Sequence, residues 1–138
     1  MWWFYALLSA FFAALTAVLA KIGIKGIDSN LATAIRTVVI LLLAWAIVLF
    51  RNDHQGISGL TRQNWTFLIL SGLATGLSWI FYFKALQLGK VSQVAPVDKA
   101  SVAIAILLSV IFLGEPLTFK TVIAVLLITG GTIILIFQ

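Results

Sequence analysis

Two adjacent charged residues, Asp98 and Lys99, carry the richest chemistry in the sequence. They lie about one turn inside the apolar stretch 92–116, which reads as one membrane-spanning helix. A charge at that depth costs roughly 2.5–3.5 kcal/mol on insertion scales. Either the pair faces a cavity or a partner, or Lys99 snorkels to the headgroups while Asp98 lies in the interface. Adjacent helical side chains point about 100° apart, so we expect each charge to have another partner, with Lys84 or Arg36 as candidates for Asp98.

Four further residues could line a cavity with this pair. Pro96 has no backbone N–H, so it should kink or loosen the first turns of its helix and free a carbonyl, which a bilayer tolerates only in protein or beside water. Arg36, inside the second apolar run, either reaches the interface along its own stem or turns inward. Trp79 and Tyr82, three residues apart, share one helix face and form either a cavity wall or an interfacial belt.

The residue set argues against several other kinds of chemistry. The chain has no cysteine, and its one histidine, His54, lies in a polar loop. We therefore expect no metal site and no cofactor. An enzyme is the least favoured class, because no nucleophile and base converge in the apolar runs.

The composition predicts an all-α integral membrane protein with a single domain over residues 1–138. Of its 138 residues 62% are hydrophobic and 9% are charged, whereas soluble domains average about a quarter charged. Apolar runs of about 20 residues, enough to cross the bilayer, predict five helices at about residues 3–23, 31–50, 65–86, 92–113 and 118–137. The net charge of +5 is scattered between these runs, which argues against a nucleic-acid partner.

Small residues predict where helices pack closely. Ala13 and Ala17 are four residues apart on one face of the first helix, and Gly130 with Gly131 lies near the middle of the last. Small-xxx-small faces and glycines let membrane helices approach each other. We expect these four positions to form helix–helix contacts.

Short motifs in the second half of the chain point to a family. They are Tyr82-x-x-Ala85-Leu86, then Val94-Ala95-Pro96, then Leu113-Gly114-Glu115-Pro116-Leu117-Thr118, followed by the glycine pair. Together they resemble the EamA domain of the drug/metabolite transporter superfamily. The resemblance is closest to a short five-helix bacterial and archaeal branch, where an element like residues 96–101 also occurs. Because most such relatives carry two domains of opposite topology, it implies one half of an inverted-repeat ten-helix transporter fold.

The loop charges suggest how a single half could form a complete transporter. With five crossings, the basic residues of the loops divide four against three between the two sides of the membrane. One side carries Lys21, Lys25, Lys84 and Lys90, and the other carries Arg51, Arg62 and Lys120. Orientation depends on an excess of positive charge, and this excess is small. Insertion in both orientations would give an antiparallel homodimer. The alternative is a fixed topology, with the Lys21 side cytoplasmic and a separate chain as partner.

The leading functional hypothesis is a transporter or exporter of a small polar organic metabolite, acting by alternating access in a bacterial or archaeal cytoplasmic (inner) membrane. Lys99 would attract an anionic group and Asp98 would hold a proton or a cation. A basic cavity favours acids, whereas an unpaired Asp98 among aromatic rings favours amines. A second hypothesis is a non-transporting membrane subunit or scaffold that pairs with another chain.

Overall fold

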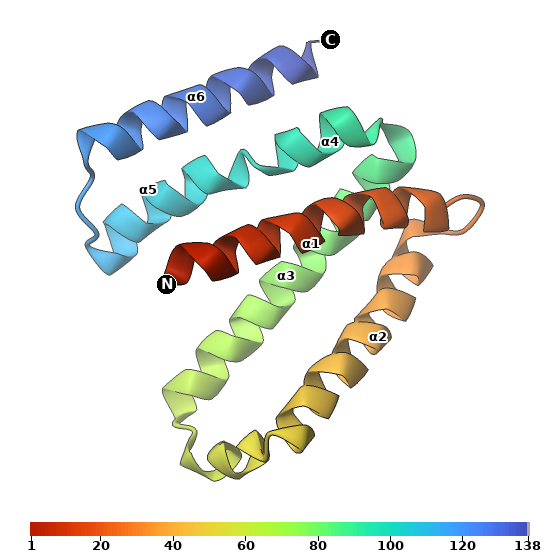
Figure 1. The fold of residues 1–138 in the computed structure, drawn as a ribbon, viewed down its shortest axis with the longest axis vertical. Coiled ribbons are helices and arrows are strands. Elements are labelled where there is room, and N and C mark those ends of the chain that lie inside the picture. The colour runs from red at the N-terminus through yellow and green to blue at the C-terminus, as the bar shows by residue number, and fades with distance from the viewer. Residues whose placement is uncertain (138) are drawn as a thin grey trace. The chain divides into compact units, whose positions relative to one another are not determined.

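The structure is a computed structural model that describes residues 1–137. The described residues are helical and contain no strand, which confirms the predicted fold class. The elements are α1 (Trp2–Gly23), α2 (Ser29–Phe50), the 3-10 helix η1 (Asp53–Gly59), α3 (Arg62–Leu88), α4 (Val91–Asp98), α5 (Ser101–Leu113) and α6 (Phe119–Ile136) (Figure 1). They fall into two compact units: one contains residues 20–87 and the other residues 1–19 with 88–137.

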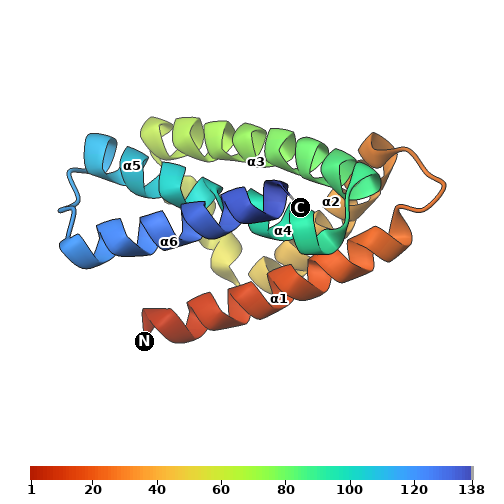
Figure 2. The same ribbon diagram turned by 90° about the horizontal axis from the view of Figure 1, so that it is seen from above.

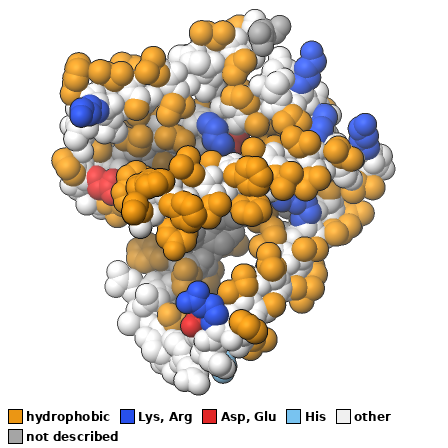
Figure 3. Space-filling model, viewed as in Figure 1, with side chains coloured by type: hydrophobic (Ala, Val, Ile, Leu, Met, Phe, Trp, Pro, Cys, Tyr) orange, Lys and Arg blue, Asp and Glu red, His pale blue; other side chains and the backbone are white. Residues whose placement is uncertain are grey.

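Five helical segments of the described chain are long and apolar enough to cross a membrane. They are α1, α2, α3, the combined stretch Val91–Leu113 and α6, with lengths of 18 to 27 residues. At 1.5 Å per residue, a helix of about 20 residues matches the roughly 30 Å of hydrocarbon. Hydrophobic side chains cover much of the face seen in Figure 3. In a bilayer this surface faces acyl chains or another apolar partner, so the chain is an integral membrane protein.

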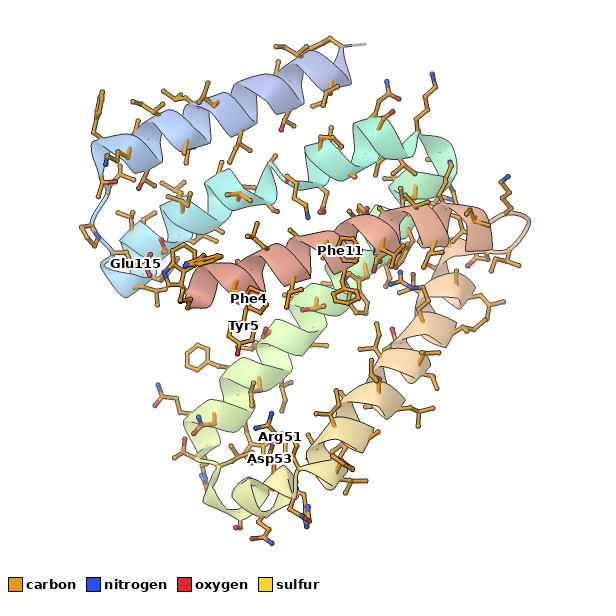
Figure 4. All side chains as sticks on the ribbon, in the orientation of Figure 1. Phe4, Tyr5, Phe11, Arg51, Asp53 and Glu115 are labelled. Atoms are coloured by element: carbon orange, nitrogen blue, oxygen red, sulfur yellow. The ribbon has the colours of Figure 1, made fainter. Side chains whose placement is uncertain are left out.

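The unit of residues 20–87 is built on α2 and α3, which η1 connects (Figure 1). Asp28 caps α2: its Oδ1 accepts a hydrogen bond from the Asn30 backbone N–H at 2.8 Å. This bond satisfies one of the donors that a helix N-terminus leaves unpaired. At the far end of α2, Arg51 and Asp53 point toward each other and form an exposed ion pair at 3.2 Å (Figure 4).

The α1–α2 connection is held against the C-terminal end of α3. The Lys21 ammonium donates to the Leu86 carbonyl, and Gln87 Nε2 donates to the Ile27 carbonyl at 2.7 Å. Leu86 itself is fully buried, with none of its surface exposed. The Leu86 carbonyl lies in the last turn of α3, where a helix leaves its acceptors unpaired, and the Ile27 carbonyl lies in the loop before α2.

In the other unit, α6 runs alongside α4 and α5 in the opposite direction (Figures 1 and 2). Gly114 ends α5 with a φ of 67°, and the Glu115 backbone N–H donates to the Ser109 carbonyl at 3.3 Å. Thr118 then caps α6 by accepting from the Thr121 N–H at 3.2 Å. A left-handed glycine followed by a threonine cap turns the chain back within a few residues.

Replacing Gly114 with Ala tests this turn. A Cβ at Gly114 would meet no heavy atom within 4 Å, so the only penalty is the left-handed backbone. We expect a loss of about 1 kcal/mol in unfolding free energy, measured by denaturant titration in detergent micelles. The matched control is Gly59→Ala, at a position that is equally open and has no left-handed φ. Equal effects of the two substitutions would contradict the account of the turn.

Candidate substrate-binding site

The fourth membrane span is interrupted between α4 and α5, next to the charged pair. Over this stretch backbone N–H groups bond three residues back instead of four: Lys99 to Pro96, Ala100 to Val97, and Val102 to Lys99, each at 3.0 Å. The helix continues from Ser101. This 3-10 geometry is poorer than α-helical geometry and often marks a functional hinge. The irregularity follows Pro96, whereas we expected it in the turns before the proline.

The position of the irregularity has a physical reason in the bonds to the Pro96 carbonyl. This oxygen accepts from the Lys99 backbone N–H and also from the Thr132 hydroxyl of α6, at 3.4 Å. In a regular α-helix the same carbonyl would accept from Ala100. Before Pro96 the chain is still helical, with the Val94 N–H donating to the Lys90 carbonyl at 2.9 Å. Bonds from the Lys99 backbone and from the Thr132 side chain therefore both stabilise the break.

Asp98 and Lys99 form an ion pair with each other, so the prediction that adjacency would keep them apart was wrong. The Lys99 Nζ to Asp98 Oδ2 distance is 3.2 Å. The 100° separation holds only within a continuous helix, and α4 ends at Asp98. The side chains are 57% exposed for Lys99 and 34% for Asp98. The pair is thus accessible and its partners can be exchanged.

Thr132 is a candidate site residue that the sequence reasoning missed. Its side chain is buried, and its hydroxyl lies 2.8 Å from the Ile128 carbonyl and 3.4 Å from that of Pro96. One hydroxyl proton is shared between the two acceptors. The sequence feature that could have identified Thr132 is its position directly after the Gly130–Gly131 pair. Two residues without side chains expose the neighbouring backbone.

In the other unit, the Arg36 side chain lies over two aromatic rings of α3. Its guanidinium carbon is 4.2 Å from the centroid of the Phe83 ring and 5.9 Å from that of Trp79. The side chain reaches the face of an aromatic ring of its own unit. Both distances suit cation–π attraction. Whether Arg36 faces a cavity, as one of the two alternatives predicts, stays a prediction.

Phe83 is the second residue that the sequence reasoning missed. It is 1% exposed and lies four residues after Trp79, so the two rings share a face of α3. Tyr82 is half-buried and its ring meets that of Phe83 edge to face, with centroids 5.6 Å apart. The i, i+4 spacing of Trp79 and Phe83 was the signal that could have identified Phe83. The predicted residues therefore form two groups, each described within its own unit.

The four predicted packing residues differ in their surroundings. Ala17 is 2% exposed, whereas Ala13 is exposed. A Cβ at Gly130 or at Gly131 would meet no heavy atom within 4 Å. Within one chain, the glycine pair therefore has open space beside it. The packing role of these positions stays a prediction, and for the glycines it would require another chain.

The fold and the polar groups at membrane depth define a class: a helical membrane protein with several spans, one of them broken beside an ion pair. Charged residues and discontinuous helices inside a bilayer are characteristic of transporters.

Comparison with known proteins identifies the family. The model of the EamA-like transporter family matches residues 1–137, so the chain belongs to this family. A protein of Sinorhizobium sp named "Uncharacterized transporter in cobO 3'region" is 50% identical over 97% of this chain and 95% of its own. An uncharacterized protein of Methanocaldococcus jannaschii is 36% identical over 51% of each chain. No solved structure matches significantly. These findings indicate a membrane transporter rather than an enzyme.

A Thr132→Val substitution tests the support of the break. It keeps the shape of the side chain and removes the hydroxyl bonds to the Pro96 and Ile128 carbonyls. We expect a loss of roughly 0.5–1.5 kcal/mol in unfolding free energy, the range for hydrogen bonds between membrane helices. Thr132→Ser, which keeps the hydroxyl, is the control. If valine were as stable as threonine, the bonds would contribute nothing to the fold.

Proposed function

We propose that this chain transports a small polar organic metabolite across the cytoplasmic (inner) membrane of a bacterium or archaeon. Transport proceeds by alternating access. Two copies inserted in opposite directions form an antiparallel homodimer and together supply the ten helices of an inverted repeat. The polar residues at the break in the fourth span contact the solute.

The observation that carries the proposal is the interruption of the fourth span beside the Asp98–Lys99 pair. Lys99 is the ninth residue of the stretch Val91–Leu113. At 1.5 Å per residue the break lies about 13 Å from the start of the span, about two helical turns inside it and deeper than the one turn expected from the sequence. Broken helices at this depth form the solute sites of transporters with inverted repeats. Irregular backbone there is stable only beside protein or water.

The ion pair suggests how the two charges act together. While Asp98 is ionised it holds Lys99 at 3.2 Å. When Asp98 takes up a proton, or binds a cation, Lys99 is released. Charge uptake at Asp98 and the release of Lys99 are thereby coupled in one element. Such pairs are common in proton relays within membranes.

Three observations support an inverted pair of copies. The relative of 50% identity that is named a transporter is matched over 95% of its length, so it too is about the size of one five-helix half. The basic residues of the loops divide four against three, a weak orientation signal. The Gly130–Gly131 face has open space within one chain, where the helix of a second copy can approach.

A Lys99→Ala substitution tests the role of the pair. We expect it to lower flux at least tenfold for any solute that the wild-type protein carries, because the coupled pair is lost. Flux is measured in proteoliposomes with a panel of labelled organic acids, amines and amino acids. Lys120→Ala, an exposed lysine at the start of α6, is the control with unchanged flux. Full transport by the Lys99 variant would rule out this role.

A Gly131→Leu substitution tests the contact between copies. The leucine side chain would fill the open space beside α6 and keep a second helix at a distance. We expect a clear loss of energy transfer between donor-labelled and acceptor-labelled copies in liposomes. Gly59→Leu, outside the membrane spans, should leave the signal unchanged. An unaffected signal for Gly131→Leu would exclude this glycine from the contact.

A further inference from the structure

The Arg36 side chain has a donor that nothing in its own unit satisfies. Its Nη1 atom is excluded from water and makes no hydrogen bond within residues 20–87. The ion pair of that unit, Arg51–Asp53, does not involve Arg36. A buried donor without a partner is costly, and the cost is greater for a charged group. Such a group requires an explanation beyond packing.

The surroundings of Arg36 stabilise the cation without satisfying its hydrogen bonds. The Phe83 ring, itself fully buried, lies 4.2 Å from the guanidinium carbon, and the Trp79 ring lies 5.9 Å from it. Ring faces attract the positive charge but accept no strong hydrogen bond in the plane of the guanidinium. Nη1 therefore still lacks an acceptor in the plane of the guanidinium, where the fork of N–H groups matches the two oxygens of a carboxylate. A carboxylate reaches it when the side chains that cover Nη1 move apart during transport.

The position of this group fits a site inside the membrane. Arg36 is the eighth residue of α2, about 11 Å from its start at 1.5 Å per residue. Trp79 and Phe83 lie in the second half of α3, which runs back toward the same end. Lys99 is already neutralised by Asp98, whereas the ion pair within residues 20–87, Arg51–Asp53, leaves Arg36 out.

We propose that Arg36, held on the Phe83 and Trp79 rings, is the receptor for the anionic group of the solute, and that the transported metabolite is an organic acid bound through its carboxylate. This inference rests on the proposed transport function and names its substrate class. Trp79 and Phe83 act as positioning residues that fix the plane of the guanidinium. The same chemistry would also bind the phosphate of an anionic lipid headgroup, so the test separates the two sources.

The test is a binding measurement that does not require flux. Purified full-length protein is melted in detergent while its tryptophan fluorescence is followed, with lactate, succinate or benzoate added. The corresponding amides at equal ionic strength are the uncharged references. We expect at least one acid, and none of the amides, to raise the melting temperature of the wild-type protein. Arg36→Gln should weaken the apparent affinity for that acid about 10-fold to 100-fold, the range for bonds to a charged group.

Two further variants make the result specific. Arg36→Lys keeps the charge but loses the planar fork, so we expect an intermediate affinity. Arg62→Gln removes an exposed arginine at the start of α3 and should bind like the wild-type protein. An acid that stabilises Arg36→Gln as strongly as the wild-type protein would overturn the proposal. So would the absence of stabilisation by all three acids, or stabilisation by phosphatidylglycerol alone.

The outcome is distinguishable from a failure of the transport proposal. Acid binding that depends on Arg36, without flux of any solute in proteoliposomes, would leave the anion site in place and refute transport. Flux of amines or neutral solutes that Arg36→Gln leaves unchanged, without acid binding, would support transport and refute the acid-specific site.

Discussion

The bilayer imposes the constraint on which the rest of this structure depends: inside hydrocarbon, every backbone and charged group must find its partner within protein. Five apolar helices meet this requirement along most of the described chain. The exceptions are few and local. At the break in the fourth span, 3-10 bonds and the Thr132 hydroxyl take over from the regular helix ladder. At Arg36, two aromatic rings stabilise the charge.

These two exceptions have different characters and suggest a division of roles. Asp98 and Lys99 neutralise each other and remain accessible, so proton or solute binding can exchange their partners. Arg36 is fixed by packing and keeps one donor unsatisfied. In our proposal the Asp98–Lys99 pair changes partners during transport, and Arg36 binds the anionic group of the solute. Arg36 lies in α2 and Asp98 ends α4. Both helices belong to membrane spans of a chain that is a member of the EamA-like transporter family.

Much of the fold was predictable because the length and hydropathy of each apolar run are strong local signals. The Asp98–Lys99 contact was not, since the prediction assumed a continuous helix. In the structure the helix is interrupted after Asp98, and the Pro96 carbonyl beside the break accepts a bond from Thr132, 36 residues further along the chain. In the sequence Phe83 is one apolar residue among many, and only the structure shows that the Arg36 guanidinium lies over its ring. Such contacts between helices depend on tertiary packing, which periodicity along one helix does not encode.

The sidedness of the polar connection between α2 and α3 tests the central claim, that copies of this chain insert in both directions. Because the native sequence has no cysteine, a single cysteine at Gly56, in η1, can be labelled in intact cells with a membrane-impermeant thiol reagent, before and after permeabilisation. Insertion in both orientations predicts that about half of the protein labels from outside. Labelling entirely from one side would contradict the inverted homodimer and would require a partner chain of opposite orientation.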